Sequence, residues 1–214
     1  PEKLAGEAIN ELLEAKYHSG RSVLLVGVTR EEVLPGSPLP LLEWLGTIVM
    51  TDTLRPQAAQ VLDYFRREGV DLKLISGDNP AAVSALAAQA GFPYADRYID
   101  MSGVTAEEEI ECAALSCSVF GRATPQQKRQ LVQALQRNGR TVAMTGDGVN
   151  DLLALREADC SIAVAAGSDA ARQVSQIVLL DSDFSALPDV LAQGRRVVNN
   201  ITRVAGVFFV KTIY

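Results

Sequence analysis

Short apolar runs alternate with amphipathic stretches through most of the chain. The apolar runs predict strands at 22–28, 44–50, 72–75, 118–120, 141–144, 161–165 and 176–180. Apolar residues at helical spacing predict helices at 57–68, 81–90, 126–137 and 149–157. Strands that alternate with helices are typical of parallel sheets. The pattern therefore predicts an α/β, Rossmann-like fold with a mostly parallel sheet and helices on both faces.

The start of the chain has a different pattern. Residues 2–17 carry apolar side chains at helical spacing, and Ser19-Gly20 ends this predicted helix. The strand at 22–28 is apolar at nearly every position, which predicts burial on both faces. Residues 31–40 hold three of the nine prolines and form the predicted linker.

Composition and charge narrow the possible functions. Hydrophobic residues make up 48% of the 214 residues, as in ordinary globular proteins. Lys and Arg number 20 against 26 Asp and Glu, which gives a net charge of −6 and argues against nucleic acid as a partner. His18 is the single histidine, so a metal site built from histidines is excluded.

Polar and acidic residues follow three of the predicted strands. These segments are residues 51–53, 76–80 and 145–151. In parallel α/β sheets, ligands bind at the carboxyl ends of the strands. We therefore expect the three segments to converge at one edge of the sheet.

The segment 145–151 has the residue types of a magnesium and phosphate site. Gly146 and Gly148 permit a tight turn close to a ligand, and Asp147 and Asp151 supply carboxylates near a helix start. The alternative is structural, with Asp147 in a turn and Asp151 as a helix cap.

Two other segments allow a functional and a structural interpretation. Ser76 could donate its hydroxyl to a phosphate, whereas Asn79-Pro80 is typical of an ordinary helix start. Lys128 lies in the first turn of a predicted helix, where a cation opposes the helix dipole unless a phosphate lies between them. Its alternative is a solvated surface lysine.

A third pair of charged residues follows the strand at 44–50. Arg55 could pair with Asp52 at a helix start, or it could reach a phosphate with two hydrogen bonds.

The order of Ser76, Lys128, Asp147 and Asp151 resembles that of the haloacid dehalogenase-like phosphotransferases. The segment TGDGVND at 145–151 more narrowly resembles the hinge motif of P-type cation-transporting ATPases, notably the bacterial calcium/magnesium-like group. Further matches are SGDN at 76–79, the D-x-x-R of Asp52 and Arg55, and Arg122 six residues before Lys128. The resemblance covers nearly the whole chain.

The resemblance implies site residues and cofactors. Ser76, Gly77 and Asp78 would contact the nucleotide or phosphoryl group. Arg21 would bridge phosphates of ATP. Asp52, Arg55, Arg122, Lys128 and Asn150 would also lie at the cofactor site. Asp147 and Asp151 would bind Mg²⁺, and Ser76, Lys128, Asp147 and Asp151 would take part in catalysis.

The resemblance also implies an architecture and an activity. Residues 1–33 would end a nucleotide-binding domain, 34–196 would form the phosphorylation domain, and 197–214 would lead into a transmembrane helix. The intact protein would be a multi-pass protein of the cell membrane, with this segment on the cytoplasmic side. It would couple hydrolysis of Mg-ATP to transport of a cation, with Ca²⁺ as the expected ion.

Some residues depart from the pattern of these pumps. The DKTGT segment, whose aspartate accepts the phosphoryl group, does not occur in these residues, and neither does the TGE loop. Two alternatives stay open. One is a soluble phosphatase with Asp52 as nucleophile, although Leu54 stands where such an enzyme needs an aspartate. The other is a regulatory module that binds nucleotide or Mg²⁺ without catalysis.

Overall fold

The computed structural model describes residues 21–29, 43–51, 53–181 and 183–213. The predicted helix at 2–17, the predicted linker at 31–40 and Asp52 lie outside these ranges. The chain divides into two units. The first contains residues 1–54 and 73–124, and the second contains residues 55–72 and 125–214.

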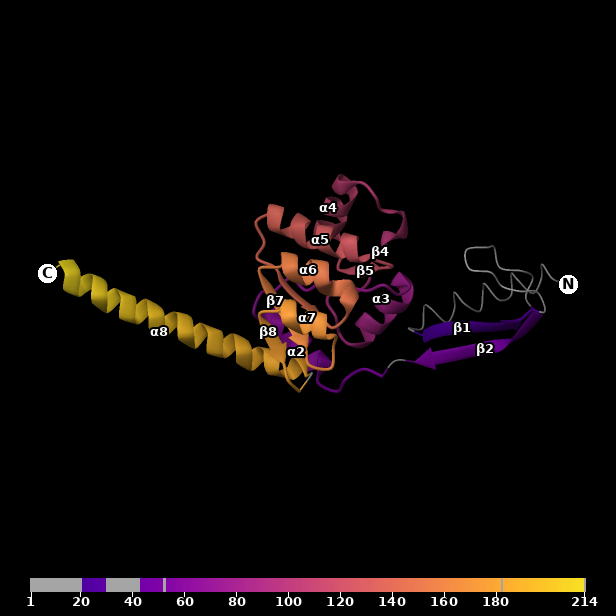
Figure 1. Ribbon diagram of the computed structural model, residues 1–214, viewed down its shortest axis with the longest axis horizontal. Coiled ribbons are helices and arrows are strands. Elements are labelled where there is room, and N and C mark those ends of the chain that lie inside the picture. Colours follow the sequence, from indigo (N-terminus) through magenta and orange to yellow (C-terminus); the bar gives the residue numbers. More distant parts are fainter. Residues whose placement is uncertain (1–20, 30–42, 52, 182, 214) are drawn as a thin grey trace. The chain divides into compact units, whose positions relative to one another are not determined.

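The first unit holds a ribbon of two strands and a small parallel sheet (Figure 1). Its elements are β1 (Arg21–Val28), β2 (Glu43–Thr51), β3 (Leu74–Ile75), α3 (Pro80–Gln89), β4 (Tyr98–Asp100), η1 (Met101–Gly103), α4 (Glu107–Ser116) and β5 (Val119–Gly121). The parallel sheet has the order β3-β5-β4. One hydrophobic cluster of this unit consists of Ala87, Ala95 and Val119, with Leu74, Val83 and Phe92 packed against them.

The second unit holds another parallel sheet of three strands, in the order β6-β7-β8. Its elements are α2 (Ala58–Arg67), α5 (Pro125–Arg137), β6 (Ala143–Gly146), η2 (Val149–Asp151), α6 (Leu152–Glu157), β7 (Cys160–Val164), α7 (Asp169–Val174), β8 (Ile177–Leu179), η3 (Phe184–Ala186) and α8 (Leu187–Ile213). Helices α5 and α6 pack through Val132, Ala154 and Ala158, and Leu155 packs on Ala163 of β7.

The α/β prediction is confirmed, with two corrections. The strand at 44–50 does not join a parallel sheet, because β2 pairs antiparallel with β1 from Arg21↔Thr51 to Val28↔Glu43. The prediction that 22–28 is buried on both faces is wrong for this chain. Leu24, Val26 and Val28 are 37–52% exposed, in a ribbon that β1 forms with β2.

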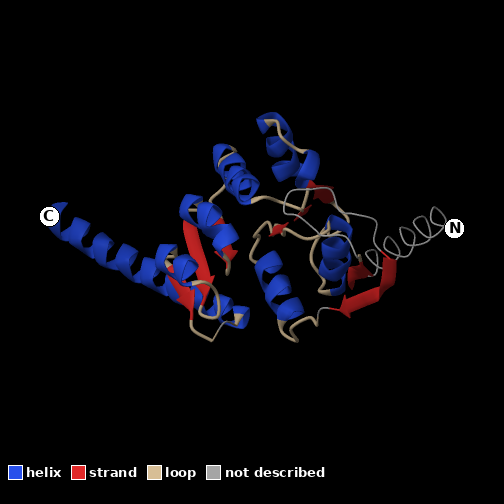
Figure 2. Cartoon of the chain, turned by 45° about the vertical axis from the view of Figure 1, so that its right-hand side comes forward, coloured by secondary structure: helices blue, strands red, loops and turns tan. Residues whose placement is uncertain are grey.

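Helix α8 runs without a break from Leu187 to Ile213 (Figure 1, Figure 2). No change of structure therefore marks the expected boundary at 196/197. Apolar side chains along the helix are exposed, namely Val197, Val198, Ile201, Val204, Val207, Phe208 and Phe209. Among the helices that the structure describes, none is both long and apolar enough to cross a membrane.

Candidate functional site

The loop after β3 holds Ser76 and Asp78 together. The Ser76 hydroxyl donates a hydrogen bond to the Asp78 carboxylate at 2.8 Å, and the Asp78 backbone N–H donates back to Ser76 Oγ at 3.1 Å. The structural interpretation of Asn79 is confirmed. Its side-chain oxygen accepts from the N–H groups of Ala81 and Ala82 and so caps α3. The same loop therefore caps helix α3 through Asn79 and carries the hydroxyl of Ser76.

Arg122 is fixed against this loop by its backbone. Its N–H donates to the Asp78 carbonyl at 2.8 Å. The preceding residue has to be glycine, because a Cβ on Gly121 would lie 2.4 Å from Pro80 Cα. Arg122 itself has a φ of 51°, a left-handed conformation that residues with a Cβ seldom adopt. The close approach of β5 to the start of α3 thus sets the position of Arg122.

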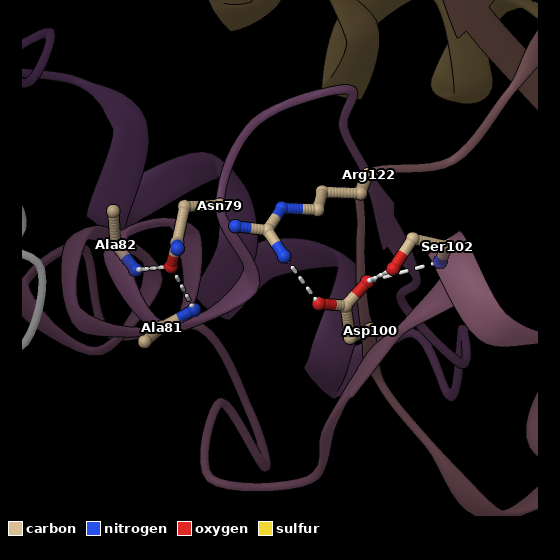
Figure 3. A network of polar contacts seen from close by, with 6 residues as sticks. All are labelled: Asn79, Ala81, Ala82, Asp100, Ser102 and Arg122. Atoms are coloured by element: carbon tan, nitrogen blue, oxygen red, sulfur yellow. Dashed lines mark hydrogen bonds and ion pairs between the residues drawn. The ribbon is translucent and has the colours of Figure 1, made fainter. Parts of the chain in front are cut away.

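The Arg122 side chain ends at an aspartate that the sequence did not predict. Nη1 of Arg122 donates to Asp100 Oδ2 at 2.8 Å (Figure 3). The other carboxylate oxygen accepts from the N–H and the hydroxyl of Ser102, at 2.9 and 2.7 Å. The Ser102 hydroxyl, then its N–H and then Arg122 hold the pKa of Asp100 below its usual value.

In the second unit, Lys128 and Asp151 form a buried ion pair. Nζ of Lys128 lies 2.7 Å from Asp151 Oδ1, and the two side chains are 10% and 11% exposed. The alternative of a solvated surface lysine is therefore wrong. Asp151 Oδ2 also accepts the backbone N–H of Gly148 at 3.3 Å, so the pair is tied to the glycine loop.

The loop around Asp147 is packed tightly through its backbone. The Asp147 carbonyl accepts from Ser168 N–H at 2.7 Å, and a Cβ on Gly167 would lie 2.5 Å from that carbonyl oxygen. The residues Asp147 and Asn150 are themselves exposed. Their oxygen atoms are the ligand type that Mg²⁺ prefers.

The number of acidic residues near this loop bears on how Mg²⁺ could bind. In the part of the chain that the structure describes, no group of three Asp, Glu, His or Cys side chains could hold a metal ion. Mg²⁺ commonly binds through one or two carboxylates together with water and substrate phosphates. Asp147 and Asp151 as ligands of Mg²⁺ stay a prediction.

Of the remaining predicted residues, the structure describes the side chain of Arg55 but not those of Arg21 and Asp52. Arg55 lies over the Phe184 ring at 5.6 Å. The pKa of Asp183 is lowered mainly by a hydrogen bond from the Ser185 hydroxyl, and the charge of Arg55 adds to this effect. Arg21 begins β1, and its side chain lies outside the described part of the chain, as does Asp52.

The structure thus brings the predicted residues into two clusters. Ser76, Gly77, Asp78 and Arg122 meet in the first unit. In the second unit Lys128 contacts Asp151, and Asp147 and Asn150 lie in the same loop as Asp151. Convergence of the two clusters, and the place of Arg21, Asp52 and Arg55 beside them, stay predictions.

The chain is similar in sequence to cation-transporting ATPases of bacteria. The chain is 46% identical over 217 residues to the probable cation-transporting ATPase exp7 of Streptococcus pneumoniae, and this match covers the whole chain and 28% of that protein. It is 44% identical over 200 residues to the calcium-transporting ATPase CtpE of Mycolicibacterium smegmatis, with coverage of 91% and 24%. The chain therefore spans about a quarter of the length of these relatives.

A solved structure supports the fold. The crystal structure of a zinc-transporting PIB-type ATPase in the E2.Pi state superposes with a TM-score of 0.64. It is 24% identical and covers 92% of this chain, while the chain covers 26% of it. The resemblance to cation-transporting ATPases noted in the sequence is confirmed by the relatives. Residues 5–159 match the family described as haloacid dehalogenase-like hydrolase. This chain belongs to the haloacid dehalogenase-like hydrolases.

Proposed function

We propose that this chain is the phosphorylation region of a P-type ATPase that couples hydrolysis of Mg-ATP to transport of a cation. The observation that carries the proposal is the 46% identity to a probable cation-transporting ATPase over the full length of the chain. A relative named as a calcium transporter favours Ca²⁺ as the transported ion. The aspartate that accepts the phosphoryl group belongs to a DKTGT segment, which these 214 residues do not contain.

The first cluster would contact the transferred phosphate or the nucleotide. Gly77 offers an exposed stretch of backbone, and Arg122 offers a guanidinium whose backbone is anchored to Asp78. The Ser76 hydroxyl would turn from the Asp78 carboxylate to the phosphate. Phosphoryl transfer depends mainly on positioning and on stabilising negative charge. Donors that are already held in place suit that task.

The second cluster would supply a cation and a metal ligand. Lys128 is held in place by its ion pair with Asp151, so it would face a phosphate without a large rearrangement. When bound, Mg²⁺ would neutralise phosphate charge and polarise the phosphoryl oxygens. Asp147 would be its ligand, with Asn150 in support. Asp151 would bind it directly or hold Lys128 and the loop in place.

The other predicted residues keep roles that rest on the resemblance. Arg21 would bridge phosphates of ATP, and Asp52 with Arg55 would lie at the nucleotide site. Residues 1–33, 34–196 and 197–214 would belong to the nucleotide domain, the phosphorylation domain and the stalk. The exposed apolar side chains of α8 are consistent with such a stalk, which would join this cytoplasmic segment to the cell membrane.

A soluble phosphatase is the second candidate, because the matching family is described as a hydrolase. Asp52 directly follows β2 and would be the nucleophile. Leu54, two residues later, has no group to transfer a proton to the leaving group. This residue makes the phosphatase the weaker candidate.

The test is the intact mass of the chain after incubation with Mg²⁺ and acetyl phosphate, with Asp52→Asn as the comparison. We expect no phosphoryl adduct on either protein. An adduct that is lost in Asp52→Asn would replace the pump proposal by the phosphatase. Mg²⁺ binding, measured by calorimetry in the presence of phosphate, should weaken in Asp147→Asn.

A matched variant controls for charge. Asp181→Asn removes an exposed carboxylate from the same unit and should leave Mg²⁺ binding unchanged. A longer protein that includes a DKTGT segment should form the adduct from ATP. If it bound ATP and never formed the adduct, the regulatory module would be the better function.

A further inference from the structure

We propose that Asp100 is a positioning residue, which holds the Arg122 guanidinium where it can meet a phosphate group. The 2.8 Å contact between Nη1 and Oδ2 carries this inference. The inference rests on the proposed function, since it gives Arg122 an anion to bind. Neither the sequence patterns nor the resemblance pointed to Asp100.

The conformation of Arg122 favours a chemical role for its side chain. A φ of 51° suits glycine and costs free energy for a residue that carries a Cβ. The backbone at this position therefore does not explain why an arginine stands here. Its N–H is tied to Asp78 of the Ser76 loop, so the base of the side chain is fixed beside the predicted phosphate contacts.

Asp100 is well prepared to hold the other end of that side chain. It lies at the end of β4, directly across from Gly121 in the register of β4 and β5. Ser102 occupies one carboxylate oxygen with two hydrogen bonds, which leaves the other oxygen for Arg122. The carboxylate is thus oriented before any ligand arrives.

The guanidinium keeps donors for an anion. Arginine has five N–H donors in a fixed plane, and Asp100 contacts one nitrogen only. The second terminal nitrogen points away from Asp100 (Figure 3), and the Arg122 side chain is 50% exposed. A phosphate oxygen could therefore reach the arginine while the ion pair stays formed.

The change in phosphate affinity on substitution of Asp100 shows whether Asp100 positions Arg122 or competes with phosphate for it. If Asp100 only competes for Arg122, then Asp100→Asn removes a negative charge and phosphate binds more tightly. If Asp100 positions Arg122, the freed side chain has to be ordered by the ligand, and binding weakens about three- to tenfold. Because the pair is half-exposed, the substitution should leave the fold intact.

The experiment titrates the 214-residue chain with each of two probes, inorganic phosphate and ATP. Both titrations contain Mg²⁺ and are followed by NMR. Weaker binding of both probes in Asp100→Asn would indicate that Arg122 meets the transferred phosphoryl group, and weaker binding of ATP alone would indicate the nucleotide. Asp100→Glu should recover part of the affinity. Asp96→Asn makes the same charge change at an exposed residue of the same unit and should not weaken either probe.

Unchanged or tighter binding in Asp100→Asn would overturn the inference. The proposed function would survive that result if Arg122→Ala still weakened binding. If the unmodified chain bound neither probe, or if Arg122→Ala had no effect, both the inference and the phosphate contact proposed for Arg122 would fail. The Arg122 side-chain N–H signals provide a separate readout, since they should broaden or move in Asp100→Asn but not in Asp96→Asn.

Discussion

The ion pairs of the two clusters, one in each unit, use the same chemistry in different surroundings. Lys128 and Asp151 are about nine-tenths buried, whereas Arg122 and Asp100 are 50% and 38% exposed. Both pairs have short contacts, at 2.7 and 2.8 Å, so geometry alone does not separate them. The pairs differ in whether water can solvate the charge that stays behind when one partner is removed.

The buried pair serves the fold as well as the site. Taking away one partner leaves a charge that water cannot reach, which costs several kcal/mol. The exposed pair contributes little to stability, on the order of 0–1 kcal/mol, because water replaces the lost partner. Loss of function at Lys128 will therefore be mixed with loss of stability, while Asp100 and Arg122 can be changed with the fold intact.

The largest effect is expected for Lys128→Met. We expect the free energy of unfolding to fall by about 3–5 kcal/mol, because the Asp151 carboxylate would stay buried without its cation. Urea denaturation followed by circular dichroism measures this loss. Replacing both partners, as in Lys128→Met with Asp151→Leu, should recover much of it.

Arg129→Met provides the matched control on the same helix. Arg129 pairs with Glu157 at 2.7 Å, but its side chain is 41% exposed, so we expect a loss of less than about 1 kcal/mol. Equal losses in Lys128→Met and Arg129→Met would remove the distinction between the two kinds of pair.

A smaller effect is expected for Gly121→Ala, which tests how the exposed pair is positioned. The added Cβ would lie 2.4 Å from the backbone of Pro80, so β5 and the start of α3 must separate. We expect a loss of about 1–3 kcal/mol in the free energy of unfolding. Thermal unfolding and the NMR signals of Arg122 report the change. Gly103→Ala is the control, because nothing lies within 4 Å of its added Cβ, and an equal loss there would refute the steric explanation.

Much of the fold could be predicted from the sequence. The predicted strands after residue 70 begin and end within two residues of the observed strands, because their apolar runs are bounded by polar loops. Strand β4 was missed, since Tyr98–Asp100 is too short to show a period and Tyr98 is exposed. Helix α4 was missed because three glutamates fill its first turn and hide the apolar face.

The candidate site could be predicted in its residue types but not in its contacts. Loop glycines and acidic residues mark Asp147 and Asp151, since few other patterns combine them after a strand. Nothing in the local sequence shows that Lys128 is buried or that Asp151 is its partner, because the two residues are 23 positions apart. Asp100 meets Arg122 through the register of β4 and β5, which depends on tertiary packing.

The smallest effect is expected for Ser102→Ala, which probes the exposed pair through the ionisation of Asp100. The Ser102 hydroxyl is the largest cause of the lowered pKa of Asp100, so its removal should move that pKa up toward the ordinary value of 3.8. A lowered pKa in the folded protein stabilises the fold above the pKa of the unfolded chain, and this contribution disappears as the pH falls through the folded value. The free energy of unfolding of the variant should therefore be slightly lower at neutral pH. Below pH 3.8, protonation of Asp100 should destabilise the variant less than it destabilises the unmodified chain. A carboxyl NMR titration measures the shift, and an unchanged pKa would mean that the Ser102 N–H and Arg122 are enough to keep the pKa of Asp100 low.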